Sequence, residues 1–259
     1  MPNYYLELSY DGTHYRGYQR QPGGVRTIQG TLEDTLTEVL GRTTTIGGCG
    51  RTDAGVHATR YFAHLRLEEP ARPNFLFVLN KRLPTGIAVR ALHPVSDKAQ
   101  ARYDATHRTY DYYAHFVPDA RLDQLSTLLG TVELDYAAIH AALALLPRYT
   151  DYYAFCKTPA RHNTTLCHFS AAELSLDGTG QRLRFRFTAN RFLRGMIRLL
   201  VNDLLDVGRG KLPAADFERM LVTRARTGYF RLAPPEGLYL TGVGYPYLEL
   251  GVLVPVGGW

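Results

Sequence analysis

The pattern of hydrophobic and polar residues in the first hundred positions predicts alternating strands and helices. Stretches of period two indicate strands, and apolar residues three and four apart indicate a helix capped by Thr27. In chain order we expect a strand over 4–10, a helix after Thr27, a β-like segment over 43–47, a strand over about 57–67, a helix over about 73–83 and a strand over 86–95. This βαββαβ order is that of a ferredoxin-like unit.

The second half of the chain repeats this order loosely. In chain order we expect a strand over 107–116, a helix over 135–146, strands over 168–176 and 181–189, a helix over 192–208, a short helix after Pro213 and a strand over 237–245. We therefore predict an α+β protein with antiparallel sheets. Its two ferredoxin-like (RNP-like) αβ subdomains would span residues 1–100 and 101–259. Two such sheets side by side would form a wide concave surface that suits an RNA stem.

The composition indicates a globular protein. The chain has 259 residues, of which 45% are hydrophobic and 21% charged. No apolar run approaches the roughly 20 residues of a membrane span, and the N-terminus lacks the basic and then apolar layout of a secretory signal. We expect a cytoplasmic protein without a membrane partner. The three cysteines form no CxxC pair, so metal dependence has little support.

The basic residues favour a nucleic-acid partner. The formal net charge is +6, and arginine accounts for 26 of the 30 basic residues. Guanidinium grips phosphate with two hydrogen bonds and stacks on bases, which the lysine ammonium cannot do. Together with 18 Tyr and 11 Phe, this composition suits contact with RNA. An arginine-rich genome would give the same composition, so this observation alone leaves both explanations open.

A glycine-rich loop over 48–58, GCGRTDAGVHA, contains one carboxylate, Asp53. One interpretation is an Asx-turn, because Asp beside Gly commonly forms turns. The other is a catalytic loop, because binding and catalytic residues often lie on loops at strand ends. Arg51, two residues away, favours the ionised carboxylate that nucleophilic attack requires. The residues of this loop alone do not decide between the two.

Six arginines and no acidic residue occupy the stretch 182–198. Three of them alternate with apolar residues along a predicted strand, and three are spaced i, i+3, i+7 on one face of a predicted helix. Like charges without acidic partners repel one another, and a polyanion would relieve that repulsion and release counterions. We favour phosphate contact over a merely solvated charged face. The six are Arg182, Arg184, Arg186, Arg191, Arg194 and Arg198.

The loop segment GRTDAGVHA over 50–58 resembles the signature of the tRNA pseudouridine synthase A family. Other blocks are similar to that family in the same order along the chain. They are SYDGTHYRGYQRQ over 9–21, TIQGTLEDTL over 27–36, QARYDATHRTYDYY over 100–113, FLRGMIRLLVNDLLDVGRGK over 192–211 and APPEGLYLTGVGYP over 233–246. The resemblance implies a pseudouridine synthase fold. It also implies an isomerase that acts on the anticodon arm of tRNA, just 3′ of the anticodon, as a homodimer whose two subunits both contact the RNA.

The resemblance also implies roles for individual residues. Asp53 would be the nucleophile, Arg51 would enter the space that the flipped base leaves, and Arg198 would pair with the catalytic carboxylate. Tyr110 would stack on the uracil and is a candidate acceptor for the proton at C5. The reaction breaks the C1′–N1 bond and forms a C1′–C5 bond without redox change or net hydrolysis, so it needs no cofactor or metal. The alternatives are an ordinary half-buried tyrosine for Tyr110 and a solvated helix arginine for Arg198.

Some positions depart from the family pattern. Tyr18 stands where the family has Trp, and Arg194 and Gly195 replace a Tyr-His pair. The segment 199–202, from Leu199 to Asn202, reads LLVN instead of the usual Asn-Ile-Val-Gly, and the Thr-x-Arg segment near 164–168 lacks its arginine. These changes lie at positions expected to face RNA, and they motivate one alternative, the same chemistry on another RNA. A second alternative is a non-catalytic RNA-binding module that kept the fold, against which the presence of Asp53, Tyr110 and Arg198 argues.

Overall fold

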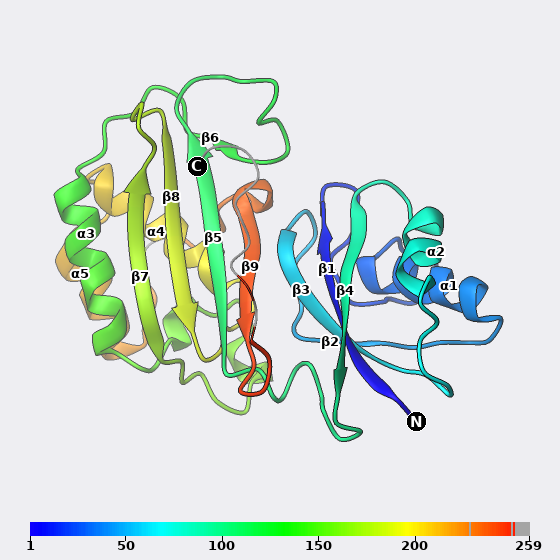
Figure 1. Cartoon of the computed structure of the whole chain (residues 1–259). Helices are drawn as coiled ribbons and strands as arrows, with labels where there is room; N and C mark the ends of the chain where they lie inside the picture. The colour runs from blue at the N-terminus through cyan, green and yellow to red at the C-terminus, as the bar shows by residue number, and fades with distance from the viewer. Residues whose placement is uncertain (228, 250, 252–259) are drawn as a thin grey trace. The chain divides into compact units, whose positions relative to one another are not determined.

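The structure, a computed structural model, describes residues 1–227, 229–249 and 251 (Figure 1). The chain forms two compact units. Of the described residues, the first unit contains Met1–Thr106 and Tyr239–Leu248, and the second contains those within His107–Leu238 together with Glu249 and Gly251. No helix among the described residues combines the length and the apolar character that crossing a membrane requires.

The first unit is a four-stranded sheet with a short additional strand. Strand β1 lies between β3 and β4 and is antiparallel to both, whereas β9 runs parallel to β3. The order confirms the predicted βαββαβ sequence, although only Gly47 of the β-like segment predicted over 43–47 lies in a strand. The elements are β1 (Asn3–Tyr10), α1 (Ile28–Leu40), β2 (Gly47–Gly48), β3 (His57–Arg66), α2 (Phe75–Arg82), β4 (Ile87–Val95) and β9 (Leu238–Gly244).

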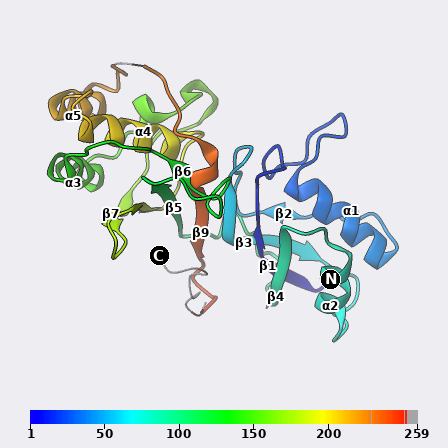
Figure 2. The same cartoon turned by 90° about the horizontal axis from the view of Figure 1, so that it is seen from above.

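Helix α1 forms as its sequence predicts. The Thr27 side chain accepts a hydrogen bond from the Gly30 N–H at 3.1 Å, which caps the N-terminus. Ile28, Leu32 and Leu36 are fully buried. Helices α1 and α2 contact each other and cover one face of the sheet (Figure 2). The loop that follows β2 therefore starts from a rigid two-layer support.

The second unit has the same two-layer construction. Its main sheet has the antiparallel order β5–β8–β7, and helices α3, α4 and α5 pack together on one face (Figures 1 and 2). The mostly antiparallel strands and covering helices confirm the predicted α+β class. The elements are β5 (His107–His115), β6 (Thr127–Leu128), α3 (Tyr136–Leu145), η1 (Leu146–Arg148), η2 (Tyr153–Phe155), η3 (Pro159–Arg161), β7 (Phe169–Leu176), β8 (Arg182–Ala189), α4 (Met196–Gly208), α5 (Ala214–Thr223) and η4 (Pro235–Gly237).

Helix α4 begins four residues later than its sequence predicts. It starts at Met196, after Gly195 with φ of 71°, and this left-handed residue interrupts the right-handed helical run. Arg191 and Arg194 therefore precede the helix. The prediction that these two arginines and Arg198 form a row on one face of a helix is therefore wrong.

Candidate active site

The loop that carries Asp53 is held by a segment from the start of the chain. The Tyr18 N–H donates to the Thr52 carbonyl at 3.2 Å, and the Gly55 N–H donates to the Tyr15 carbonyl at 3.2 Å. The Tyr10 and Thr52 hydroxyls are hydrogen-bonded at 2.8 Å. Main-chain bonds on both sides of Asp53 thus fix its position against residues some forty positions earlier.

Two glycines allow this close approach. A Cβ atom at Gly12 would lie 2.0 Å from the Val56 carbonyl oxygen, and one at Gly17 would lie 2.6 Å from the Thr52 carbonyl oxygen. Gly17 also has φ of 92°, which favours glycine. The first segment can therefore pack directly against the loop backbone only because these positions have no side chain.

Within the loop, three neighbouring residues differ in exposure. Thr52 is buried, Asp53 is half-buried and Arg51 is exposed. A hydrogen bond from the Val56 N–H to the Asp53 carbonyl, at 3.2 Å, closes the turn. The buried threonine anchors the loop while the arginine on one side of it extends into solvent. A wedge role for Arg51 needs such exposure.

Two stacked tyrosines, one of them hydrogen-bonded to Gly50, support the loop. The rings of Tyr18 and Tyr61 have centroids 4.3 Å apart at 27°, and the Tyr61 hydroxyl donates to the Gly50 carbonyl at 2.6 Å. Burial raises the pKa of both phenols. Tyr18, which replaces the family's Trp, therefore remains a buried aromatic support. Sequence reasoning singled out neither Tyr61 nor Tyr10.

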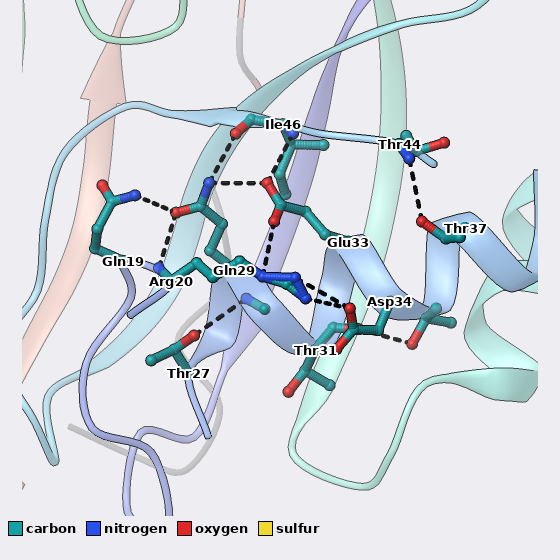
Figure 3. A network of polar contacts seen from close by, with 12 residues as sticks. Gln19, Arg20, Thr27, Gln29, Thr31, Glu33, Asp34, Thr37, Thr44 and Ile46 are labelled. Atoms are coloured by element: carbon teal, nitrogen blue, oxygen red, sulfur yellow. Dashed lines mark hydrogen bonds and ion pairs between the residues drawn. The ribbon is translucent and has the colours of Figure 1, made fainter. Parts of the chain in front are cut away.

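A buried polar network ties this support to helix α1 (Figure 3). Gln29 donates through Nε2 to Glu33 Oε1 at 2.9 Å and to the Ile46 carbonyl at 3.0 Å. The Ile46 N–H donates to Glu33 Oε1 at 3.1 Å, and Arg20 Nε lies 3.3 Å from Glu33 Oε2. The Arg20 N–H donates to Gln29 Oε1 at 3.0 Å. The network therefore joins the helix to both segments that hold the loop.

His57, the first residue of β3, lies beside the loop as a strand residue, as predicted. Its Nδ1 is 3.1 Å from Asp11 Oδ1, and its ring stacks on Tyr239 with centroids 4.5 Å apart. Burial would raise the pKa of Asp11, but hydrogen bonds from Thr13 and the charge of His57 outweigh it, so this pKa is lowered. The end of the loop is thus fixed by polar contacts as well as by the sheet.

In the second unit, Tyr110 and the strand arginines lie on opposite faces of the sheet. The β5–β8 register pairs Tyr110 with Phe187 and Asp111 with Arg186. Paired residues in a register share a face, and Phe187 is fully buried. Tyr110 therefore lies on the face that the helices cover, half-buried, with its ring edge against Phe192 at 5.1 Å.

Arg186 and Arg182 have acidic partners. Arg186 makes two hydrogen bonds of 2.7 Å to Asp111, and Arg182 lies 3.7 Å from Asp119. The hydrogen bonds that Arg186 donates to the Asp111 carboxylate raise the pKa of Arg186. The expectation that these arginines have no acidic partner is wrong for both, because the acids come from other parts of the chain. The RNA-binding roles of Arg182, Arg184, Arg186, Arg191 and Arg194 stay predictions.

Arg198 is half-buried and bound to the main chain, which argues against a solvated helix arginine. Its Nε donates to the Ala233 carbonyl at 2.6 Å, and its own carbonyl accepts from the Ala233 N–H at 2.9 Å. The Tyr112 hydroxyl donates to the next carbonyl, that of Pro234, at 3.0 Å. Burial raises the pKa of Tyr112 and the nearby Arg198 opposes the rise. Because Tyr112 shares a face with Tyr110, Arg198 and Tyr110 lie on the same side of their sheet.

The predicted catalytic residues are thus distributed over both units. Asp53 and Arg51 belong to the first unit, and Tyr110 and Arg198 belong to the second. The pairing of Arg198 with Asp53 stays a prediction. Among the described residues, no group of three or more His, Cys, Asp or Glu side chains is arranged to hold a metal ion.

Known proteins are similar in sequence to this chain over most of its length. The sequence matches the profile of the family described as tRNA pseudouridine synthase over residues 8–104 and 149–246. It is 39% identical to a tRNA pseudouridine synthase A of Porphyromonas gingivalis, over 95% of this chain and 98% of the relative. A protein of the same name from Bacteroides thetaiotaomicron is 37% identical, over 100% and 99% of the two chains. One from Picosynechococcus is 38% identical, over 93% and 88%.

Proposed function

Because this chain belongs to the tRNA pseudouridine synthase family, we propose that it is an isomerase that converts uridine to pseudouridine in tRNA. The observation that carries the proposal is the similarity to curated relatives over nearly the whole length of both chains. The loop with Asp53 lies inside the matched range. Its fixed backbone is the preorganised support that a reacting side chain needs.

We further propose that Asp53 is the nucleophile. The reaction needs a group that holds the ribose or the base while the C1′–N1 bond is broken and the uracil turns. A carboxylate can do this as a covalent nucleophile. Asp53 is half-buried in a loop whose backbone is bonded on both sides, which supports this role. The balance is complete without a co-reactant, because the C5 hydrogen leaves as a proton and N1 gains one.

Three further residues have roles in this proposal. Exposed Arg51 would fill the gap that the flipped nucleotide leaves, since taking a base out of its stack costs a few kcal/mol. Tyr110 would stack on the uracil and accept the proton from C5. Arg198, held by Ala233, would keep the carboxylate of Asp53 ionised and oriented. All three assignments follow the family resemblance and are consistent with the exposure and contacts of these side chains.

We propose that the modified uridines lie in the anticodon arm of tRNA, just 3′ of the anticodon. We also propose that the protein acts as a homodimer whose two subunits both contact the tRNA. The same chemistry on another RNA is the second candidate, because Arg194, Gly195, Leu199 and Asn202 depart from the family pattern. Sequencing pseudouridines in total RNA with and without the gene separates the two. Loss of pseudouridine only outside tRNA would contradict the first candidate.

Tritium release tests the reaction itself. When tRNA carries tritium at C5 of uridine, only isomerisation frees that hydrogen into water. We expect the purified protein to release tritium in proportion to the pseudouridine formed, without added metal or cofactor. A protein that binds tRNA tightly and releases none would be the non-catalytic RNA-binding module, and the proposed function would be wrong.

A further inference from the structure

The segment 224–233 of the second unit is fastened to helix α4 at two points. Arg226 makes two hydrogen bonds to Asp203, of 2.7 and 3.0 Å, and Ala233 is bonded in both directions to Arg198. Asp203 and Arg198 are five residues apart on α4. The described residues between the two attachments therefore lie beside the arginine that the proposed function places in catalysis.

The Arg226–Asp203 pair is a firm attachment. The side chains of Arg226 and Asp203 are 13% and 6% exposed. The guanidinium also donates to the Tyr229 carbonyl at 3.1 Å and to the Ala154 carbonyl at 3.4 Å. A buried, bidentate pair with further carbonyl acceptors holds its geometry much better than an exposed ion pair does. The hydrogen bond from Arg226 to the Tyr229 carbonyl thus positions the main chain of Tyr229.

This firmly held segment exposes two aromatic side chains. Tyr229 is 93% exposed and Phe230 is 49% exposed. The Arg226 guanidinium lies over the Phe230 ring at 5.4 Å, which holds that ring at the surface. Burying such side chains in the core would stabilise the fold. Adjacent exposed aromatic rings on an anchored segment indicate a surface for a binding partner.

Exposed cationic side chains lie close to the same segment. The Leu232 side chain packs toward Gly195, where a Cβ atom would lie 3.2 Å from it, so the segment passes next to exposed Arg194. The Lys157 N–H donates to the Arg194 carbonyl at 2.9 Å. Lys157, Arg194 and Arg231 are all exposed, and none has an acidic side chain within 4.0 Å among the described residues. The partner of this surface is therefore expected to be anionic.

We propose that Tyr229 and Phe230 form a stacking platform for an unpaired base of the RNA substrate, with Lys157, Arg194 and Arg231 contacting the adjacent phosphates. This inference rests on the proposed function, because it takes the RNA substrate as the ligand. Aromatic rings bind the faces of unpaired bases, whereas paired bases in an A-form stem have their faces covered by stacking. The site thus recognises a single-stranded loop rather than the stem.

Equilibrium binding of an unmodified tRNA transcript tests the platform without depending on turnover. Removing one base–aromatic contact weakens binding by about 5- to 150-fold, so Tyr229→Ala should fall in that range. Tyr229→Phe and Tyr229→Trp should bind like the wild type, because both keep a stacking ring. Phe77→Ala is the matched control, since Phe77 is 65% exposed on α2 of the other unit; it should bind like the wild type.

Salt dependence separates the rings from the cations. Arg231→Ala should reduce the slope of log K against log salt by about one phosphate contact, whereas Tyr229→Ala should leave the slope unchanged.

Wild-type affinity in Tyr229→Ala would overturn the proposal, and so would equal weakening in Tyr229→Phe. A change of molecular mass in Tyr229→Ala with unchanged RNA affinity would also overturn it, because the rings would then contact a second copy of the chain. If the wild-type protein binds tRNA but releases no tritium, only the proposed isomerisation is contradicted. The stacking platform is tested by binding affinity, which does not depend on turnover.

Discussion

At the scale of single residues, neighbouring side chains on a strand lie on opposite faces of the sheet and therefore make different contacts. Tyr110 pairs with buried Phe187, while the next residue, Asp111, binds Arg186 on the opposite face. Alternation along a strand is visible in the sequence, but the register between two strands is not. The sequence therefore places Tyr110 and Arg186 in one RNA-binding set, and the structure separates them.

Replacing Tyr110 with Phe tests its hydroxyl. The variant keeps the ring that would stack on uracil but cannot accept the proton from C5. We expect kcat to fall by about 100-fold or more, the range for loss of a general base, while KM for tRNA stays close to that of the wild type. Steady-state tritium release measures both constants.

Tyr113→Phe is the control for this prediction. Tyr113 lies on the same strand but on the opposite face, where its hydroxyl donates to Asp111 at 3.2 Å. Its removal should change kcat little. Equal kcat values for Tyr110→Phe and the wild type would show that the Tyr110 hydroxyl moves no proton in the reaction.

At the scale of elements, local signals predict most boundaries and long-range contacts decide the rest. Thr27 caps α1 as its sequence indicates. The helix predicted to begin at 192 begins at Met196, because Gly195 adopts φ of 71°. Nothing in the residue pattern gives that angle, since glycine is also tolerated inside helices. Likewise, only the structure shows that β9 is hydrogen-bonded to β3, because strand order along the chain does not identify strand partners.

The buried network on α1 also went unpredicted, although a signal exists. Gln29 and Glu33 are polar residues spaced i, i+4 on the otherwise apolar face of a predicted helix. Buried polar side chains need hydrogen-bond partners, so such a pair indicates a buried network. Its partners, Arg20 and Ile46, could not be identified without the fold.

Removing the Glu33 carboxylate should destabilise the first unit. Glu33→Ala leaves the Ile46 N–H and one of the two N–H groups of the Gln29 amide without an acceptor. We expect the free energy of unfolding to fall by about 1–3 kcal/mol, because unsatisfied buried donors cost that much. Glu38→Ala on the same helix is the control. Glu38 is 67% exposed and 3.9 Å from Arg82, so its loss should change stability by less than about 0.5 kcal/mol. Urea unfolding of both variants makes the comparison, and equal stabilities would refute the role given to the network.

In the second unit, we expect His115 to make the free energy of unfolding depend on pH. Burial lowers the pKa of His115, the neighbouring Arg182 lowers it further and Asp119 opposes this. The unfolded chain then binds a proton more readily than the folded one. Stability is complete above the unfolded pKa of about 6.5 and decreases as the pH falls toward the lower folded value. Thermal melts at about pH 7 and pH 5 should show a larger loss for the wild type than for His115→Gln. An equal loss in both proteins would contradict this assignment.

At the scale of the whole molecule, the family resemblance in the sequence supplied more of the function than composition or periodicity did. Residue patterns alone left Asp53 open between an Asx-turn and a nucleophile. The structure adds what holds that residue: the backbone bonds to Tyr15 and Tyr18 and the close approach at Gly12 and Gly17. These contacts join segments about forty residues apart, so the pattern around the loop could not reveal them.

Tritium release by Asp53→Asn, measured beside tRNA binding, is the most direct test that Asp53 carries the isomerisation. The amide has the size of the carboxylate but is a much weaker nucleophile. Asp34→Asn, with a side chain 68% exposed on α1, is the matched control. We predict that Asp53→Asn binds tRNA about as tightly as the wild type and releases no tritium, while Asp34→Asn keeps full activity. Tritium release by Asp53→Asn at the wild-type rate would contradict the account.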